Sequence, residues 1–232
     1  MIKLAIFDLG ETLINYQGLA LDWSEHYEPA LRQVFEGFGI PIDENKLDIA
    51  SSILRKYNTR INPRNEEVTA EEIFSAILEQ IGINQDYRDR TIERFFNYFQ
   101  RRAEPNENAE KILLNLKSAG IRVAVLTDVP YGMPKNLVLK DLELIIKYID
   151  LVITSCDAGF RKPSSEGVEM ILKYFQIGKD EAVYIGNEMK DIDLAKNYGV
   201  KSILLNRSEN VPNWEQTFTI CSLSEIADLL KS

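Results

Sequence analysis

Side chains that could carry out group-transfer chemistry follow four apolar runs of the chain. A carboxylate, Asp8, follows the first run, and a hydroxyl, Thr127, follows the second. An ammonium, Lys162, comes after the third run, and Asn187 and Asp191 come after the fourth. A carboxylate can act as a nucleophile, an ammonium and a hydroxyl can stabilise developing negative charge, and oxygen ligands can hold a divalent cation. Each residue alone is weak evidence, but together in this order they favour a functional site.

The apolar runs that carry these residues predict a parallel sheet. They are short and rich in Val, Ile and Leu, as strands buried on both faces are. Amphipathic helical patterns lie between them, and two of these end at Gly120 and Gly199, which are typical helix stops. Strand alternating with helix predicts a doubly wound, Rossmann-like α/β core with right-handed crossovers. The expected strands are residues 2–7, 121–126, 151–154, 182–185 and 200–205, with a short sixth at 217–220.

The segment between the first two strands predicts an all-helical insert. Asp43 can cap one helix there, and Thr69 and Glu72 have the spacing of a capping box before another. Ligands of doubly wound sheets bind at the carboxyl ends of the strands, so an insert at this point would cover that edge as a cap. We therefore expect a core domain of residues 1–15 and 104–232 and a helical cap domain of residues 16–103.

The composition is that of an ordinary globular protein, with 45% hydrophobic and 27% charged residues. A net charge of −9 argues against nonspecific nucleic-acid binding and against binding to an anionic membrane surface. No apolar run is long enough to span a bilayer, and no signal-peptide pattern is present. Two cysteines, Cys156 and Cys221, are too few for a secreted disulfide framework. We expect a cytoplasmic protein that is a monomer or a homodimer.

The order of these motifs resembles that of the haloacid dehalogenase-like superfamily of hydrolases, over essentially the whole chain. The four family motifs match residues 8–12, Thr127, Lys162 and residues 187–191. The run from residue 150 to 155, followed by residues 159–163, is also similar to the approach to the family's lysine. The helical insert matches the C1-type cap that many members carry between the first and second motifs.

The resemblance implies a role for each of these side chains. Asp8 would attack phosphorus and form an aspartyl-phosphate, which splits one difficult step into two. Lys162 would screen charge near Asp8 and the transferring group, and Thr127 would donate a hydrogen bond to a phosphoryl oxygen. The implied activity is that of a phosphatase for a small phosphorylated metabolite.

The resemblance also implies a Mg²⁺ ion between the carboxylate and the phosphate. Its ligands would be the Asp8 carboxylate, the Gly10 carbonyl and the last motif, through Asn187 or Asp191. The family usually has a metal-binding Asp where this chain has Asn187. An amide oxygen can coordinate Mg²⁺ but brings no charge, so Asp191 or Glu188 could supply the missing negative charge.

A second departure from the family concerns the general acid. Most phosphatases of this class carry an Asp two residues after the nucleophile, where this chain has Gly10. Loss of general acid-base help typically costs ~10²- to 10⁴-fold in rate. Glu11 is the nearest replacement, although a loop carboxylate of this kind is more often solvated or a cap partner.

Two alternative functions therefore stay open. A metal-independent 2-haloacid dehalogenase would also lack the second Asp and carry an Asn in the last motif, but it would have an aromatic residue in place of Gly10. Its halide-binding Arg has no convincing counterpart, since Arg32 stands at a different separation from Asp8. The second alternative is a weakly catalytic or non-catalytic protein that binds a phosphometabolite.

Substrate selection is expected from the cap and from the segment after the first strand. Two arginines in a Pro-containing loop, Arg60 and Arg64, could clamp an anionic substrate, or the loop could simply be solvated. Glu11 and Asp128 are further candidates beside the nucleophile. The other residues considered for this role are Tyr16, Trp23, His26, Tyr27 and Asn62.

Overall fold

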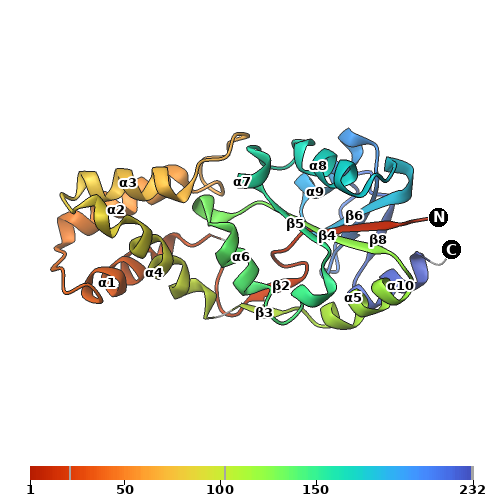
Figure 1. Ribbon diagram of the computed structural model, residues 1–232, viewed down its shortest axis with the longest axis horizontal. Coiled ribbons are helices and arrows are strands. Elements are labelled where there is room, and N and C mark those ends of the chain that lie inside the picture. Colours follow the sequence, from red (N-terminus) through yellow and green to blue (C-terminus); the bar gives the residue numbers. More distant parts are fainter. Residues whose placement is uncertain (21, 102, 231–232) are drawn as a thin grey trace.

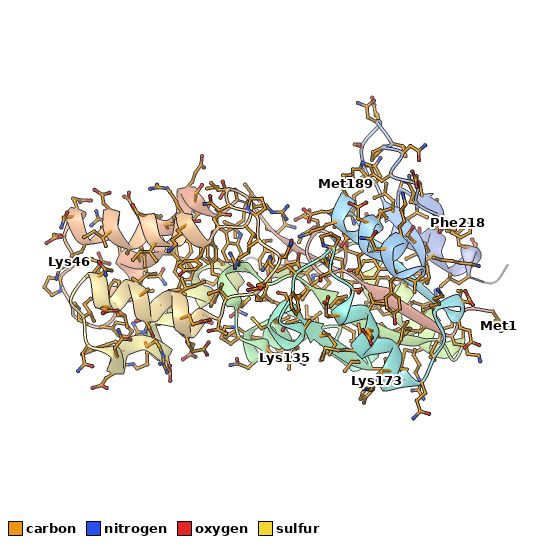
Figure 2. The ribbon with its side chains drawn as sticks, turned by 90° about the horizontal axis from the view of Figure 1, so that it is seen from above. Met1, Lys46, Lys135, Lys173, Met189 and Phe218 are labelled. Atoms are coloured by element: carbon orange, nitrogen blue, oxygen red, sulfur yellow. The ribbon has the colours of Figure 1, made fainter. Side chains whose placement is uncertain are left out.

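The computed structural model describes residues 1–20, 22–101 and 103–230. The molecule is elongated, with a helical bundle at one end and an α/β unit at the other (Figure 1). Lys46 lies at the outer end of the bundle and Met1 at the opposite end of the molecule (Figure 2). None of the helices in these ranges combines the length and the apolar character needed to cross a membrane.

Six parallel strands form the central sheet in the order β5-β4-β1-β6-β7-β8. The first strand lies in the middle, where Phe7 is opposite Val125 of β4 and Ile185 of β6. This order confirms the predicted doubly wound sheet, including its short last strand. The strands are β1 Leu4–Phe7, β4 Arg122–Thr127, β5 Leu151–Thr154, β6 Ala182–Gly186, β7 Lys201–Leu205 and β8 Phe218–Ile220.

Helices cover both faces of this sheet (Figure 1). Side chains alternate along β1, so Leu4 and Ile6 join an apolar cluster with α8 and α9, whereas Ala5 and Phe7 join one with α5 and α10. Burial on both faces explains why the strands read as continuous apolar runs. The helices of this unit are α5 Ala109–Ser118, α6 Lys135–Asp141, α7 Ser155–Ala158, α8 Glu166–Phe175, α9 Met189–Tyr198 and α10 Ile226–Leu229.

Four α-helices form the bundle within the described residues, and two of them begin at the predicted capping residues. Asp43 accepts a hydrogen bond from the amide of Lys46, and Thr69 and Glu72 form the expected capping box. Phenylalanine side chains pack edge to face in its core, among them Phe74, Phe95 and Phe96. The bundle helices are α1 Tyr27–Glu36, α2 Glu44–Tyr57, α3 Ala70–Gln80 and α4 Arg88–Gln100. The 3₁₀ turns of the chain are Ser24–His26, Gln85–Tyr87, Pro130–Gly132, Ile146–Tyr148, Lys179–Glu181 and Leu223–Glu225.

The chain leaves the sheet unit and returns to it through a two-stranded antiparallel ribbon. Strand β2, Ile14–Tyr16, pairs with β3, Ala103–Pro105. The sequence did not predict this ribbon, because two three-residue strands that are only partly buried leave no apolar run to detect. The predicted domain boundaries, at residues 15/16 and 103/104, fall within this ribbon. The division of the chain into two domains at these boundaries stays a prediction.

A second attachment joins the bundle to the sheet unit through the loop between α2 and α3. The amide of Arg161 donates to the carbonyl of Asn65 (2.7 Å), and the amide of Glu67 donates to the carbonyl of Gly159 (2.9 Å). The Glu67 side chain is 2% exposed and forms ion pairs with Arg161 and with Arg64. It also accepts a hydrogen bond from the Ser155 hydroxyl (2.5 Å). This buried carboxylate therefore holds the loop against the segment that leads into Lys162.

We expect Glu67→Gln to lower the free energy of unfolding by about 3 kcal/mol, because removal of this charge leaves the buried Arg161 with only the more distant carboxylate of Asp128, at 3.9 Å, as a counter-ion. Urea denaturation measures the effect. The matched control is the neighbouring Glu66→Gln, whose side chain is exposed, and it should change stability by no more than about 0.5 kcal/mol. Equal effects of the two substitutions would contradict this account of the attachment.

Candidate active site

Three of the predicted site residues meet in a buried cluster at the carboxyl ends of the strands. Asp8 follows β1, and its amide donates to the carbonyl of Ile185 in β6 (2.8 Å). The ammonium of Lys162 lies 2.5 Å from Asp8 Oδ1 and 2.6 Å from Asp191 Oδ1. All three side chains are buried. One cation thus lies between two carboxylates that come from different strand ends.

The start of α9 fixes Asp191 in this cluster. Asp191 is the third residue of the helix, and its Oδ2 accepts from the amides of Asn187 (3.1 Å) and Glu188 (2.9 Å). These bonds satisfy two amides that the helix leaves without partners. Gly186 is needed beside it, because a Cβ at that position would lie 2.4 Å from Asp191 Cγ. Asp191 is thus both a helix cap and the second anchor of Lys162.

Thr12 links the first and last motifs. Its hydroxyl donates to Asn187 Oδ1 (3.0 Å) and lies 3.5 Å from Asp8 Oδ2. The Thr12 carbonyl accepts from Asn106 Nδ2 (2.9 Å), which holds the turn after β1 in place. The amide oxygen of Asn187 is therefore oriented by Thr12, next to the carboxylate of Asp8.

The protonation of the cluster follows from its burial and its charges. Burial raises the pKa of Asp8 to about 6, against the lowering influence of Lys162 and with a smaller raising influence from Asp191. Burial lowers the pKa of Lys162, but Asp191 and Asp8 outweigh burial and hold that pKa well above its usual range. Lys162 therefore stays an ammonium, and added positive charge near Asp8 would favour its ionised form.

Asp128, which follows Thr127 at the end of β4, organises the cations of the site. Its carboxylate accepts from the amide of Lys162 (3.0 Å) and from the ammonium of Lys190 (2.9 Å). Burial alone would raise the pKa of Asp128, but Lys162, Lys190 and Arg161 together hold it at about 2. Asp128 is thus a permanent anion. Lys190 lies inside the last motif but was not predicted as a site residue, because a lysine at a helix start is usually solvated.

A cavity opens between the strand ends and the bundle side of the molecule. Asp8, Gly10, Thr127, Asn187 and Lys190 line one part of it. Glu11, Asp128 and Arg60, also predicted for the site, line it too, whereas Lys162 and Asp191 lie outside the lining. The other wall includes Tyr16 and Trp23, as the sequence analysis expected, and also Tyr131, Met133, Val138 and Asp141.

Several residues considered for substrate binding lie elsewhere. Arg64 does not line the cavity, because its guanidinium binds Glu67 (2.8 Å) and the carbonyl of Tyr57 (2.7 Å). His26, Tyr27 and Asn62 are likewise outside the lining. Arg60 does line it, but its guanidinium is paired with Glu188 (2.5 Å). In the loop between α2 and α3, both arginine side chains are therefore engaged in contacts within the protein.

Asp141, at the end of α6, is a cavity residue that the sequence analysis did not single out. Its Oδ2 accepts a hydrogen bond from the Tyr16 hydroxyl (2.5 Å). Burial raises the pKa of Asp141 to about 6, although hydrogen bonds from Tyr16 and Gln100 lower it in part. No sequence signal marks this residue, because it becomes a wall of the cavity only through the placement of α6 between the bundle and the sheet (Figure 1).

The fold agrees with the sequence comparisons. The haloacid dehalogenase-like hydrolase family matches residues 2–199, so the chain belongs to this family and is a hydrolase of its class. A glyceraldehyde 3-phosphate phosphatase of Methanocaldococcus jannaschii is 28% identical, over 100% of this chain and 98% of the relative. The pyrophosphatase PpaX of Halalkalibacterium halodurans is 22% identical, over 99% of this chain and 97% of the relative.

Solved structures share the fold over the whole chain. The 2-haloacid dehalogenase of Pseudomonas syringae superposes with a TM-score of 0.71 at 19% identity, covering 100% of this chain and 99% of the other. A phosphatase of the same family from Thermococcus onnurineus has a TM-score of 0.66 at 20% identity, covering 99% and 98%. These structural similarities support the fold alone. The reaction has to be inferred from the residues of the site.

The donor atoms beside Asp8 fit a magnesium ion. No group of three His, Cys, Asp or Glu side chains able to hold a metal occurs within residues 1–20, 22–101 and 103–230. Mg²⁺, however, is usually bound through only one or two carboxylates together with waters and substrate phosphates. The carboxylate of Asp8, the carbonyl of Gly10 and the amide oxygen of Asn187 are oxygen donors of the required kind.

The raised pKa of Asp141 predicts a pH-dependent cost to stability. Because the pKa is higher in the folded protein than in the unfolded chain, stability falls as the pH rises from about 4 to about 6. We expect Asp141→Asn to be more stable than the wild type at about pH 8, by about 2 kcal/mol, and to lose that advantage below about pH 4. Denaturation at the two pH values measures this, with the exposed Glu143→Gln as the control. A stability difference that does not change with pH would contradict the prediction.

Proposed function

We propose that this hydrolase is a phosphatase that cleaves small phosphate monoesters through an aspartyl-phosphate intermediate on Asp8. The observation that carries the proposal is the buried triad in which Lys162 joins Asp8 to Asp191. Such an arrangement orients one carboxylate and keeps a cation next to the site of charge development. Similarity over most or all of the chain to proteins named as phosphatases supports the same reaction class.

In the proposed reaction, a carboxylate oxygen of Asp8 attacks phosphorus while the bond to the leaving oxygen breaks. Water then hydrolyses the acyl phosphate, which releases inorganic phosphate and regenerates Asp8. Lys162 fixes Asp8 and offsets negative charge, and the Thr127 hydroxyl is positioned to donate to a phosphoryl oxygen. Lys190, which was not predicted from the sequence, adds a second ammonium to the site, and unlike Lys162 it lines the cavity.

We assign the Mg²⁺ ligands to the Asp8 carboxylate, the Gly10 carbonyl and the Asn187 amide oxygen. Asp191, predicted as a further ligand, has both oxygens engaged by Lys162 and by two backbone amides. It is better suited to positioning Lys162 than to binding the ion. When bound, Mg²⁺ neutralises charge between two anions and acts as a Lewis acid on the phosphoryl group.

A metal-independent dehalogenase is the second candidate, because Asp8 supplies the only carboxylate among the three proposed Mg²⁺ ligands. The structure places Arg32 on α1, where it pairs with Glu44 at the surface and does not line the cavity. Arg60 and Arg161 do line the cavity, but each is paired with an acid. No guanidinium of the described cavity wall is thus left for a halide, which favours the phosphatase over the dehalogenase. A phosphometabolite-binding protein without turnover is the third candidate.

Mg²⁺-dependent release of phosphate from p-nitrophenyl phosphate and acetyl phosphate tests the proposal. We expect Asp8→Asn to lower this activity by at least ~10³-fold, because the amide cannot act as the nucleophile. The exposed Asp180→Asn should retain the wild-type rate. Halide release from a 2-haloacid without metal would instead establish the dehalogenase, and absence of turnover with both substrate classes would favour the binding protein.

The empty space beside Gly10 predicts how the enzyme responds to a restored acid. A Cβ at Gly10 would meet no atom within 4 Å, and its backbone is compatible with any residue, so an aspartate fits there. We expect Gly10→Asp to raise kcat for an alkyl phosphate by ~10- to 100-fold, because its poor leaving group gains most from protonation. Acetyl phosphate, which has a good leaving group, should gain little.

The matched control for this change is Gly10→Asn, which has the same size but no acidic proton. It should leave the rates with both substrates near those of the wild type. An equal gain for Asp and Asn, or an equal gain for both leaving groups, would show that the missing acid does not limit the wild-type enzyme.

A further inference from the structure

Three aromatic rings form a continuous wall of the cavity. The ring of Tyr16 lies 6.0 Å from that of Trp23, and Trp23 lies 6.0 Å from Tyr131. All three residues line the cavity that also contains Asp8. Phe99 covers Trp23 in a parallel stack with centroids 3.9 Å apart, so the indole is fixed from behind. These rings offer π-electron surfaces that come from β2, from the start of the bundle and from the turn after β4.

A carboxylate lies at the edge of this aromatic wall. Asp141 lines the same cavity and is joined to Tyr16 by a hydrogen bond from the Tyr16 hydroxyl. Within the residues that the structure describes, Asp141 forms no ion pair with a lysine, an arginine or a histidine. The two buried carboxylates of the cavity lining, Asp8 and Asp128, each have an ammonium beside them. Asp141 is therefore a half-buried carboxylate that lines the cavity without a cation of its own.

The backbone of this wall is held in an unfavourable conformation. Tyr131 has φ = 49°, which is rare for a residue with a side chain. Gly132 follows with φ = 63°, and a Cβ there would lie 2.2 Å from the carbonyl of Val68 in the bundle loop. Strained residues persist where the surrounding structure dictates them, and they are concentrated at binding sites. The loop between α2 and α3 thus packs closely against the turn that presents the Tyr131 ring to the cavity.

Aromatic faces and an unpaired carboxylate attract the same kind of ligand, an organic cation. The negative faces of Trp and Tyr rings bind ammonium groups, including quaternary ones, and a carboxylate adds direct Coulombic attraction. A second anionic group on the substrate would instead be repelled by Asp141. The guanidinium of Arg60, which lies in the loop between α2 and α3 and lines the cavity, is already paired with Glu188.

We propose that the leaving group of the substrate carries an ammonium, which is held by Asp141 and by the rings of Tyr16, Trp23 and Tyr131. This inference rests on the proposed phosphatase function and narrows its substrate to the phosphate monoesters of amino alcohols. The phosphate faces Asp8, and the cation occupies the aromatic part of the same cavity. A neutral or anionic leaving group leaves the Asp141 carboxylate without a cationic partner.

A binding experiment tests the ammonium site without any turnover. We expect choline to raise the Tm of the full chain by about 2 °C or more at millimolar concentration, and 3,3-dimethylbutan-1-ol, its neutral isostere, to have no effect. The shift should persist in Asp8→Asn and disappear in Asp141→Asn, while Glu143→Gln should behave as the wild type. Equal shifts with choline and the isostere, or no shift with choline, would overturn the proposal.

Turnover provides the second test. Phosphocholine should be hydrolysed with a kcat/KM about tenfold above that of 3,3-dimethylbutyl phosphate, and Asp141→Asn should bring this ratio close to one. A ratio near one in the wild type would overturn the ammonium site, even if p-nitrophenyl phosphate is hydrolysed normally. If no phosphate ester is hydrolysed, the phosphatase function fails, and the choline experiment still decides whether the cation site exists.

Discussion

The contact of the Lys162 ammonium with two buried carboxylates is the interaction on which the rest of the site depends. Two carboxylates this close to each other repel in a buried setting, and the ammonium between them offsets that repulsion. The cation in turn needs both of them, because an unpaired ammonium at this depth would lose its charge. The first strand, the lysine segment and the helix after β6 are thus tied to one another by electrostatics as well as by packing.

Several neighbouring residues hold this triad in place. Gly186 keeps space open for Asp191, and the start of α9 supplies the amides that orient that carboxylate. Asp128 accepts the amide of Lys162 and so fixes the backbone from which the ammonium extends. One residue earlier in the chain, Arg161 reaches the bundle through Glu67. The segment that carries Lys162 is therefore also the segment to which the loop between α2 and α3 is attached.

The sequence predicted the parts of this arrangement that follow from strong local patterns. Continuous apolar runs marked the strands, and the rule that parallel strands end at one edge brought Asp8, Lys162 and Asp191 together correctly. The helix caps at Asp43 and Thr69 were also predictable, because a short polar side chain before an apolar helical stripe commonly caps the helix. Predictions of this kind depend on few residues, all close in the chain.

Other features depend on contacts that no local pattern encodes. The ribbon of β2 and β3 joins strands that are about 90 residues apart and too short to show periodicity. Tyr131 takes a left-handed backbone that its type disfavours, in a turn whose Gly132 packs closely against Val68 of the loop between α2 and α3. Asp141 looks like any surface acid in the sequence. Arg64 could not be assigned either, since its role is decided by Glu67, a residue whose burial is visible only in the folded chain.

The bundle is joined to the sheet unit at several separated places. They include the β2–β3 ribbon, the contact of residues 65–67 with residues 159–161, and the hydrogen bond from Gln100 to the carbonyl of Leu137. The cavity lining takes residues from both sides of this junction, because Tyr57 belongs to the bundle whereas Tyr131 and Asp141 belong to the sheet unit. A displacement of the bundle would therefore change the distances across the cavity, whereas the contacts of Lys162 with Asp8 and Asp191 lie wholly within the sheet unit.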